Sequence, residues 1–440
     1  VNGQAVVTLS GEYTEDITLT ADVLWRLEGG VFIGDDTAPT TLTIEPGTQI
    51  FGDTATKAFL TIRRNAQIIA DGTADAPIVM TSAQAPGSRN RGDWGGLVIN
   101  GKAPINGCID DLAVCTAKGE GGTGTYGGDD PNDNSGILRY LRVEFAGHPI
   151  TPDNELNGIA FQGVGAGTTL EYIQVHMADD DGIEFFGGTA SFKYVLTTGI
   201  SDDNLDWTDG WTGMGQFLVV QQYAGAGDQG IEADNNGENN DLTPRSWPTL
   251  KNLTFVGSPE SKKSDIGILL REGTGAQIYD TLVVGFEDAC FDIDNDATWA
   301  QAGDQDTFII SNVHLACAKS FKTNDEEVKV DSADATCPDG SVEGSTPEED
   351  EGEFFCKQQD PADLEAWFLT EAWGNSLIED IDSILVDAFN ETTPSFVPTE
   401  GIAAVSGTGE LDAWFTDANF VGGVDPNNDW TQGWTTSALN

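Results

Sequence analysis

A short alternation of acidic and apolar residues occurs three times between Asp179 and Asp234. In each copy an acid and a turn residue precede an apolar–acid–apolar run, and the copies begin 22 and 26 residues apart. The three copies are Asp180-Asp181-Gly182-Ile183-Glu184-Phe185, Asp202-Asp203-Asn204-Leu205-Asp206-Trp207 and Asp228-Gln229-Gly230-Ile231-Glu232-Ala233. A period of two predicts a strand with one buried face. Because a lone strand cannot bury that face, its repetition predicts the stacked coils of a parallel β-helix.

Strand patterns on both sides of this region extend the ladder. Leu42-Thr43-Ile44 recurs 18 residues later as Leu60-Thr61-Ile62, and Ile78-Val79-Met80 and Leu97-Val98-Ile99 continue it at a spacing of 19. We expect these segments to stack as successive coils of 18–20 residues. A second series interleaves with the first and consists of Leu141, Ile173, Val195, Val219, Leu253, Leu282 and Val313. Two interleaved series without helical periodicity between them predict an all-β solenoid with at least two sheets.

The other segments are organised around this solenoid. Residues 1–323 are predicted to form the β-helix, interrupted at about 107–135 by a surface loop rich in Gly, Asp and Asn. Residues 324–358 are acidic and poor in apolar side chains, which indicates a flexible, disulfide-tied loop. Helical spacing begins at Pro361. Residues 359–440 are therefore expected to be mixed helices and loops that cap the solenoid, whose end would otherwise expose strand edges.

The charge balance narrows the choice of partners. Among 440 residues there are 20 Lys and Arg against 73 Asp and Glu, which gives a formal charge of −53. This charge excludes electrostatic attraction to nucleic acid or to an anionic bilayer. It fits either bound divalent cations or a solvated surface adapted to salt. No apolar run approaches the roughly 18 residues of a membrane span, so we expect no transmembrane segment.

Six cysteines fall into three local pairs, which are Cys108 with Cys115, Cys290 with Cys317, and Cys337 with Cys356. No Cys-x-x-Cys or Cys/His cluster points to a metal site instead. We therefore predict three disulfides and an oxidising, extracellular compartment, with free buried thiols as the alternative. The chain begins at Val1 without a basic and apolar leader, so any export signal is expected to have been removed or never to have been present.

The repeated acids form the strongest candidate site. In-register stacking would place Glu184, Asp206 and Glu232 in one outward column, between Ala160 and Leu269 on the neighbouring coils. A second column, four residues earlier, would contain Asp180, Asp202 and Asp228. Such a patch of carboxylates repels itself unless it is protonated or bridged, and hard oxygen ligands suit Ca²⁺. We predict that these six residues bind calcium; the alternative is that turn acids accept hydrogen bonds from backbone N–H groups.

The same patch also allows a catalytic interpretation. Paired carboxylates serve as acid and base in glycoside hydrolysis, so Glu184, Asp206 and Glu232 could act with Arg271, the basic residue on the next coil, in a polysaccharide lyase or hydrolase. Calcium would have to bridge a polyanionic substrate to so acidic a protein. His176 precedes an acidic run and could pair with an aspartate, but we favour the interpretation of a hydrogen-bonded turn histidine.

A Trp-Thr-x-Gly-Trp unit appears twice, at Trp207 to Trp211 and at Trp430 to Trp434. Exposed tryptophans can stack on sugar faces, whereas buried ones would pin turns and close the cap. We favour the structural interpretation.

Several longer motifs support a resemblance to a known family. They are Asp93-Trp94-Gly95-Gly96-Leu97-Val98-Ile99-Asn100-Gly101-Lys102-Ala103-Pro104-Ile105-Asn106, Leu42-Thr43-Ile44-Glu45-Pro46-Gly47-Thr48, Tyr140-Leu141-Arg142-Val143-Glu144-Phe145-Ala146-Gly147 and the closing run from Asp429 to Thr435. The chain resembles a family of exported bacterial right-handed parallel β-helix proteins, mostly uncharacterised surface proteins, secreted proteins or lipoproteins. The resemblance implies a right-handed parallel β-helix on or outside the cell, and it carries no catalytic residue. Val1 departs from the acylated cysteine of a lipoprotein.

Together these features predict an exported, calcium-stabilised β-helix that acts as a cell-surface structural or binding protein and is able to self-associate. The alternative is a polysaccharide lyase or glycoside hydrolase that uses the acidic face.

Overall fold

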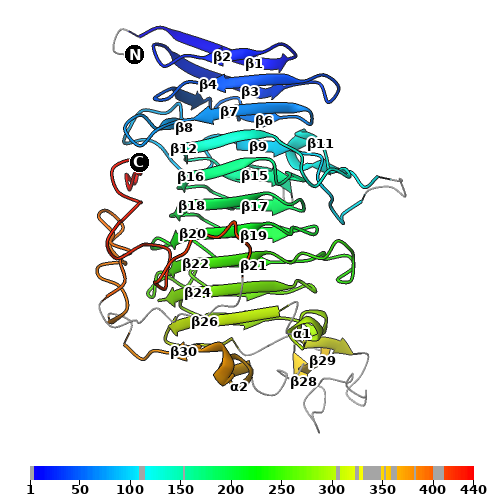
Figure 1. Ribbon diagram of the computed structural model, residues 1–440, viewed down its shortest axis with the longest axis vertical. Helices are drawn as coiled ribbons and strands as arrows, with labels where there is room; N and C mark the ends of the chain where they lie inside the picture. The colour runs from blue at the N-terminus through cyan, green and yellow to red at the C-terminus, as the bar shows by residue number, and fades with distance from the viewer. Residues whose placement is uncertain are drawn as a thin grey trace.

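The protein is a right-handed parallel β-helix whose coils stack from the N-terminus downwards in Figure 1. The computed structural model describes residues 4–108, 114–151, 154–303, 308–322, 327–330, 348–350, 353–357, 364–380, 383–399 and 411–440. In these segments, 23 strands belong to one continuous sheet system, and every pairing within it is parallel.

The first strands of the solenoid are β1 (Val6–Tyr13), β2 (Ile17–Leu19), β3 (Leu24–Ile33), β4 (Thr40–Ile44), β5 (Gln49–Gly52), β6 (Phe59–Ile62), β7 (Ala66–Asp71), β8 (Ile78–Ser82) and β9 (Gly96–Asn100). The strands that follow are β12 (Gly136–Glu144), β15 (Ile159–Gln162), β16 (Thr169–His176), β17 (Ile183–Phe186), β18 (Ser191–Thr198), β19 (Leu205–Thr208), β20 (Met214–Gln221), β21 (Ile231–Ala233), β22 (Thr249–Val256), β23 (Ile266–Leu270), β24 (Ala276–Val284), β25 (Ala289–Ile293), β26 (Phe308–Ala316) and β30 (Ser376–Leu377).

Three strand columns line the solenoid. Short strands form one column, in which β9, β15, β17, β19, β21, β23 and β25 pair in order. The long strands form the other two, because β12 pairs with β7 before Tyr140 and with β8 after it. The bend between the two halves needs a residue with positive φ, and a left-handed residue recurs there on seven coils with φ between 47° and 63°. These residues are Tyr140, Tyr172, Tyr194, Phe217, Asn252, Asp280 and Asn312.

The expected coil length of 18–20 residues is wrong. Leu42 pairs with Ile68, whereas Leu60 pairs with Val31 and Leu97, so the two similar segments lie in different columns of one coil. The repeat in the sequence therefore marks different sides of the solenoid rather than successive coils. Alternation alone cannot separate these cases, because strands in every column have the same period of two.

Two members of the second predicted series are also shifted by one residue. Val195 pairs with Leu218 rather than Val219, and Leu253 pairs with Thr281 rather than Leu282. Val219 and Leu282 instead face outwards and are buried under the C-terminal part of the chain. A strand that is covered on both faces is apolar throughout, so its pattern does not reveal which face is inside.

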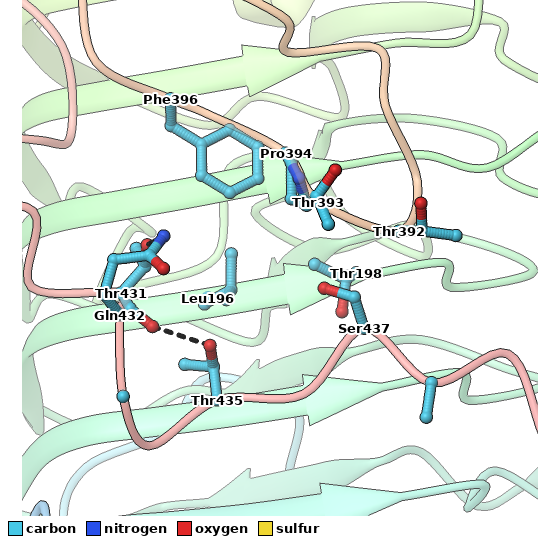
Figure 2. Close-up of a pocket in the computed structure, with 12 residues that line it drawn as sticks. Leu196, Thr198, Thr392, Thr393, Pro394, Phe396, Thr431, Gln432, Thr435 and Ser437 are labelled. Carbon is cyan, nitrogen blue, oxygen red and sulfur yellow. Dashed lines mark hydrogen bonds between the residues drawn. The ribbon is translucent and has the colours of Figure 1, made fainter.

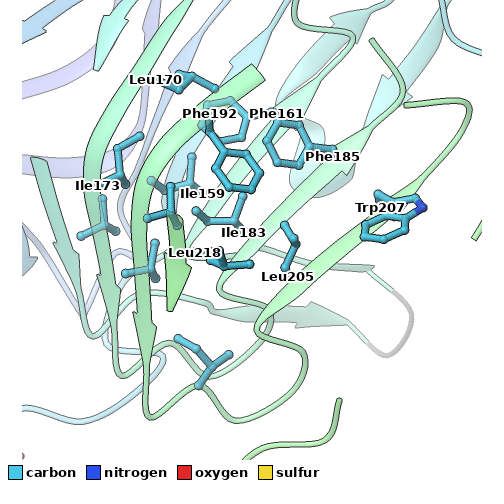
Figure 3. Packing of buried hydrophobic residues seen from close by; sticks show 14 of the residues in the cluster. Ile159, Phe161, Leu170, Ile173, Ile183, Phe185, Phe192, Leu205, Trp207 and Leu218 are labelled. Carbon is cyan, nitrogen blue, oxygen red and sulfur yellow. The ribbon is translucent and has the colours of Figure 1, made fainter. Parts of the chain in front are cut away.

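The core fills the centre of the solenoid with stacked columns of side chains. Figure 3 shows the aromatic part of this packing, where Phe161 and Phe185 stack with their ring centroids 4.9 Å apart. Trp211 lies 4.2 Å from Phe185 between ring centroids, and both Trp207 and Trp211 are fully buried. The first Trp-Thr-x-Gly-Trp unit is therefore a core element, as the structural interpretation predicted.

Several shorter elements interrupt or close the solenoid. The inserted segments contain the antiparallel pairs β10 (Ala117–Gly119) with β11 (Gly124–Tyr126) and β13 (Pro149–Thr151) with β14 (Asn154–Glu155), and the 3₁₀ turn η1 (Glu120–Gly122). Elements near the end are α1 (Asp296–Ala302), β27 (Glu327–Val330), β28 (Glu348–Asp350), β29 (Glu353–Lys357), α2 (Leu364–Phe368) and η2 (Glu371–Trp373). The segment expected to be an acidic loop thus contains three short antiparallel strands. Phe368 is buried against Phe291 at the bottom of the solenoid, so α2 closes this end.

The last thirty residues do not cap the end, as we expected for the whole of 359–440. They run back along the flank of the long strands, as the red segment in Figure 1 shows. The stack of Tyr140, Tyr172 and Tyr194 has ring centroids 4.4 and 4.3 Å apart, and Trp434 and Trp430 pack on it edge-on. Because both tryptophans are buried, the structural interpretation also holds for the second tryptophan unit.

Polar side chains of the long strands bind the backbone of this C-terminal segment. The amide of Gln174 donates to the carbonyl oxygen of Thr436 at 2.7 Å and accepts from its N–H at 2.8 Å. Gln216 makes the same pair of bonds with Thr416. His176 lies 2.7 Å from the Thr198 hydroxyl and 2.8 Å from the Ala438 carbonyl, so it is a hydrogen-bonded structural histidine. Burial lowers the pKa of His176 to about 4, which keeps it neutral.

We expect Trp434→Ala to loosen the C-terminal segment. The substitution removes the indole that covers the tyrosine stack, and deletion of a buried tryptophan costs about 3–5 kcal/mol. Hydrogen exchange of residues 411–440 should accelerate, whereas exchange in β16 to β20 should change little. Leu439→Ala, at an exposed position of the same segment, is the matched control. Equal protection in both variants would contradict the assigned role of the indole.

Candidate metal site

The register of the short strands builds the acidic column that the sequence predicts. Glu184 of β17 pairs with Asp206 of β19, and Asp206 pairs with Glu232 of β21. Ala160 and Leu269 occupy the same position on the coils before and after, so the column contains three acids. The predicted register of this column and its two boundaries are confirmed.

The turns that lead into these strands supply the remaining acids. Asp181 accepts a hydrogen bond from the N–H of Asp203 at 3.0 Å, and Asp203 accepts one from the N–H of Gln229 at 2.6 Å. Gln229 continues the ladder with its side-chain oxygen, which accepts from Ile266 N at 3.2 Å. The alternative explanation, that turn acids accept hydrogen bonds from the backbone, therefore holds for Asp181 and Asp203. In each of them only one carboxylate oxygen has this role.

Carboxylate oxygens of neighbouring coils meet in four overlapping groups of three. Within each group, one oxygen from each residue lies within 4.8 Å of the others. The groups are Asp180–Asp181–Asp202, Asp181–Glu184–Asp206, Asp202–Asp203–Asp228 and Asp203–Asp206–Glu232. All six predicted ligands are brought together. Asp181 and Asp203 complete the groups. They were not predicted as ligands because only one acid of each turn was assigned to the second column, although the Asp-Asp doublets are visible in the sequence.

The acids line a cavity of about 190 Å³ on the short-strand face. Two of its walls come from inserted hairpins, Glu120 from the β10–β11 segment and Glu155 from β14. The lining residues are Glu120, Glu155, Asn157, Asp180, Asp181, Glu184, Asp202, Asp203, Asp206 and Glu232. Nine of these ten side chains are carboxylates, which makes the cavity a strongly negative site.

Few cationic or donor groups balance this charge. The amide of Asn157 donates to Glu184 at 2.5 Å, and Arg271 pairs with Glu232 at 2.6 Å and with Asp234 at 2.8 Å. One oxygen of Asp206, Oδ1, is buried without a hydrogen-bond partner among the described residues. A buried carboxylate oxygen without a partner is costly, so this atom is where a bound cation would contribute most.

Burial and mutual repulsion raise the carboxyl pKa values throughout the cluster. The pKa rises to about 8 for Asp180, where burial is the main cause and Glu155 and Asp202 add repulsion. It rises to about 7 for Glu232, despite the nearby Arg271 guanidinium, and to about 6 for Asp228. Burial also raises the pKa values of Asp181, Glu184, Asp203 and Asp206 well above their usual range. In the absence of a cation, the folded protein therefore holds protons here at neutral pH.

Arg271 lies next to the cluster, as predicted, but it is already engaged. Its ion pairs with Glu232 and Asp234 raise the pKa of the guanidinium further above its ordinary value. A proton acceptor needs a pKa near the working pH. The geometry therefore assigns Arg271 the task of neutralising Glu232 and gives no support to a role as a base.

A further cavity of about 550 Å³ lies between β18 and the C-terminal segment, and Figure 2 shows it. Threonine hydroxyls and apolar groups line it, and the Thr435 hydroxyl donates to the carbonyl oxygen of Thr431 at 2.6 Å. None of its lining residues has a titratable side chain, so it lacks the chemistry of the acidic cavity.

Two of the three predicted disulfides lie among the described residues and are confirmed. Cys108 and Cys115 are joined with a Cα–Cα distance of 5.1 Å, and Cys290 and Cys317 with one of 5.6 Å. The predicted pair of Cys337 with Cys356 lies outside the residues whose side chains are described. Where the structure describes the chain, it contains no helix that is both long and apolar enough to span a membrane.

The fold and the site together define a parallel β-helix with a carboxylate-lined cavity on one sheet. The family described as Pectate-lyase like beta helix domain matches residues 11–352. The chain belongs to this family of pectate-lyase-like β-helices. Comparison with curated proteins and with solved structures gave no match.

The raised pKa values predict a pH dependence of stability. A carboxyl group with a raised pKa in the folded state stabilises the protein at low pH, and this stability is lost as pH rises through the folded pKa. The buried, neutral His176 has the opposite effect on stability below pH 6.5, its ordinary pKa. The effect of the carboxyl groups is therefore isolated between pH 6.5 and about 8. In EDTA, the unfolding free energy should fall across this window, and denaturant titrations at several pH values would measure it. Asp180→Asn should flatten the slope, and a slope identical to that of the native sequence would contradict the assignment.

Proposed function

We propose that the acidic cluster binds Ca²⁺ and that the protein is an exported, calcium-stabilised β-helix with a structural or binding role at the cell surface. The observation that carries the proposal is the presence of four groups of three acidic residues. In each group, one carboxylate oxygen from each residue lies within 4.8 Å of the other two. Calcium–oxygen distances are about 2.3–2.6 Å, so two ligands on opposite sides of one ion are about 5 Å apart. The spacing in each group therefore fits a shared calcium ion.

The donor set supports calcium over other ions. All eight residues of the four groups offer carboxylate oxygens, and none offers sulfur or imidazole. Calcium takes six to eight such oxygens in flexible geometry, whereas zinc prefers nitrogen and sulfur. Asp206 Oδ1, which has no partner among the described residues, would gain one.

A calcium ion at this place would join neighbouring coils. Each group contains acids from two stacked coils, for example Asp203 with Asp206 on one coil and Glu232 on the next. The ion would therefore replace repulsion along the solenoid axis with attraction. This role is structural and requires no substrate.

The compartment and the partners are part of the same proposal. Two disulfides are typical of proteins in oxidising compartments, which supports export. At the N-terminal end, β1 pairs only with β3, so its outer edge has no partner strand among the described residues. Such an edge favours strand pairing with another chain and supports self-association.

A second candidate function is that of a polysaccharide lyase or glycoside hydrolase. It is favoured by the pectate-lyase-like family and by the raised pKa of Glu184, which would suit a general acid. Two observations weigh against it. Glu184 and Asp206 are equivalent residues of two paired strands, with oxygens within 4.8 Å of each other, so the two carboxylates lie side by side on one face and do not flank a scissile bond. Arg271 is held in ion pairs rather than free to act as a base.

Thermal unfolding in calcium and in EDTA, at constant and moderately high ionic strength, tests the proposal. At a free calcium concentration about 100 times the dissociation constant, the folded state gains about 2.7 kcal/mol, so the midpoint should rise by several degrees. Asp206→Asn should reduce this rise and should not lower stability in EDTA, because it removes a buried charge. Asp380→Asn makes the same change at an exposed position and serves as the control. Superimposable curves for the native protein in the two buffers would refute calcium binding.

Turnover of pectate separates the two candidate functions. We expect no unsaturated products by absorbance and no new reducing ends when pectate is incubated with the protein in calcium. Lyase or hydrolase activity that disappears in Glu184→Gln, while the calcium-induced shift of the midpoint remains, would replace the structural role with the enzymatic one.

A further inference from the structure

A larger cavity, of about 1020 Å³, lies beyond the other ends of the strands that carry the acidic column. Asp209 follows β19 directly, and Asn236 follows β21 by three residues, so both lie where the coils leave the short-strand sheet. Tyr126 reaches the cavity from β11 of the inserted segment, and Leu242 comes from the loop after β21. The acidic cluster and this cavity thus occupy opposite ends of the same strands and have no lining residue in common.

Asp209 is the central group of this cavity, and the surrounding structure fixes its position. The Tyr126 hydroxyl donates to its Oδ2 at 3.2 Å, and the Asn236 amide donates to its Oδ1 at 3.0 Å. Its φ of 55° lies in the left-handed region, which an aspartate tolerates at some cost. Gly107 faces the carboxylate so closely that a Cβ at this position would clash with both carboxylate oxygens. A strained, partly buried acid held by two donors is typical of a functional position.

Further hydrogen bonds fix the residues around Asp209. Asn236 accepts from the N–H groups of Glu238 and Asn239 at 3.2 and 3.1 Å, which fixes its amide toward the carboxylate. Asn106 donates to Asn235 Oδ1 and to the carbonyl oxygen of Pro244, both at 2.9 Å. This network of hydrogen bonds fixes the loop after β21 to the solenoid. The residues at the base of the cavity are therefore in place before any ligand binds.

The chemistry of the lining indicates the class of ligand. A carboxylate accepts about four hydrogen bonds, and the two donors to Asp209 leave room for hydroxyl groups of a ligand. Leu242 supplies apolar surface beside the buried Tyr126, and Glu238 and Lys118 stand at exposed positions of the lining. Two carboxylates against one ammonium disfavour an anion. Oriented acceptors beside an apolar side chain, in a cavity of ligand size, fit a neutral sugar with vicinal hydroxyl groups.

We propose that this cavity binds a neutral saccharide, with Asp209 accepting hydrogen bonds from two of its hydroxyl groups and Leu242 packing beside the ring. The site does not depend on calcium in the acidic cluster. It gives the β-helix a carbohydrate-binding function that is separate from the cation site and requires no bond to be broken.

Saturation-transfer NMR with cellobiose, lactose and maltose as probes tests this proposal on the full chain. We expect binding of at least one of the three, with equal affinity in calcium and in EDTA. Asp209→Asn should weaken that binding at least about tenfold, because a hydrogen bond to a charged group is lost or weakened. Asparagine tolerates the left-handed conformation, so this variant should fold. Leu242→Trp should abolish binding by filling the cavity from an exposed loop.

Asp241→Asn is the matched control, because it removes the same charge from the same loop, where Asp241 pairs with Arg245 and its side chain is 80% exposed. This variant should bind as the native protein does. The proposal is overturned if none of the three sugars binds. It is also overturned if a sugar binds but Asp209→Asn and Leu242→Trp leave its affinity unchanged. Loss of binding in EDTA alone would place the sugar at the acidic cluster instead.

Discussion

Parallel in-register stacking is the constraint on which the rest of this structure depends. It places equivalent residues of neighbouring coils about 4.8 Å apart. Apolar residues gain from this arrangement, because each coil buries the inner face of the next, and the aromatic stacks in the core and on the flank follow the same spacing. Carboxylates are destabilised by this arrangement, because it places like charges close together. Two unit charges 4 Å apart repel by about 1 kcal/mol in water and by about 4 kcal/mol at an effective dielectric constant of 20. In the column of Glu184, Asp206 and Glu232, the repeat therefore works against the fold.

The protein relieves this repulsion only in part. Backbone N–H groups bind one oxygen of Asp181 and one of Asp203, and Arg271 neutralises Glu232 at the edge of the column. The middle of the column keeps Asp206, whose Oδ1 has no partner among the described residues. Burial, and after it the mutual repulsion, raises the carboxyl pKa values, so protonation relieves the rest of the repulsion at low pH. A divalent cation would do the same at neutral pH, and this competition links the stability, the pH dependence and the proposed role.

The sequence predicted the features that repeat and missed those that depend on contacts between distant segments. The column around Asp206 was predictable down to its register, because its strands alternate strictly and each follows a turn residue. Val219 and Leu282 were misplaced by one residue, because the C-terminal segment covers their outer face and removes the alternation. Glu120, Glu155 and the Tyr126–Asp209 contact were not predictable, since they bring inserted hairpins onto coils far away in the chain. A local sequence pattern does not indicate which distant coil an inserted segment will contact.

The most direct test of the central claim is a crystal structure from calcium-containing solution, with anomalous differences collected at a wavelength where calcium scatters anomalously. We predict a peak between Asp203, Asp206 and Glu232 or in the adjoining group of Asp181, Glu184 and Asp206, and no peak there in crystals grown with EDTA. A cavity that contains only water at saturating calcium and pH 8, with the carboxylates in the same positions, would contradict it.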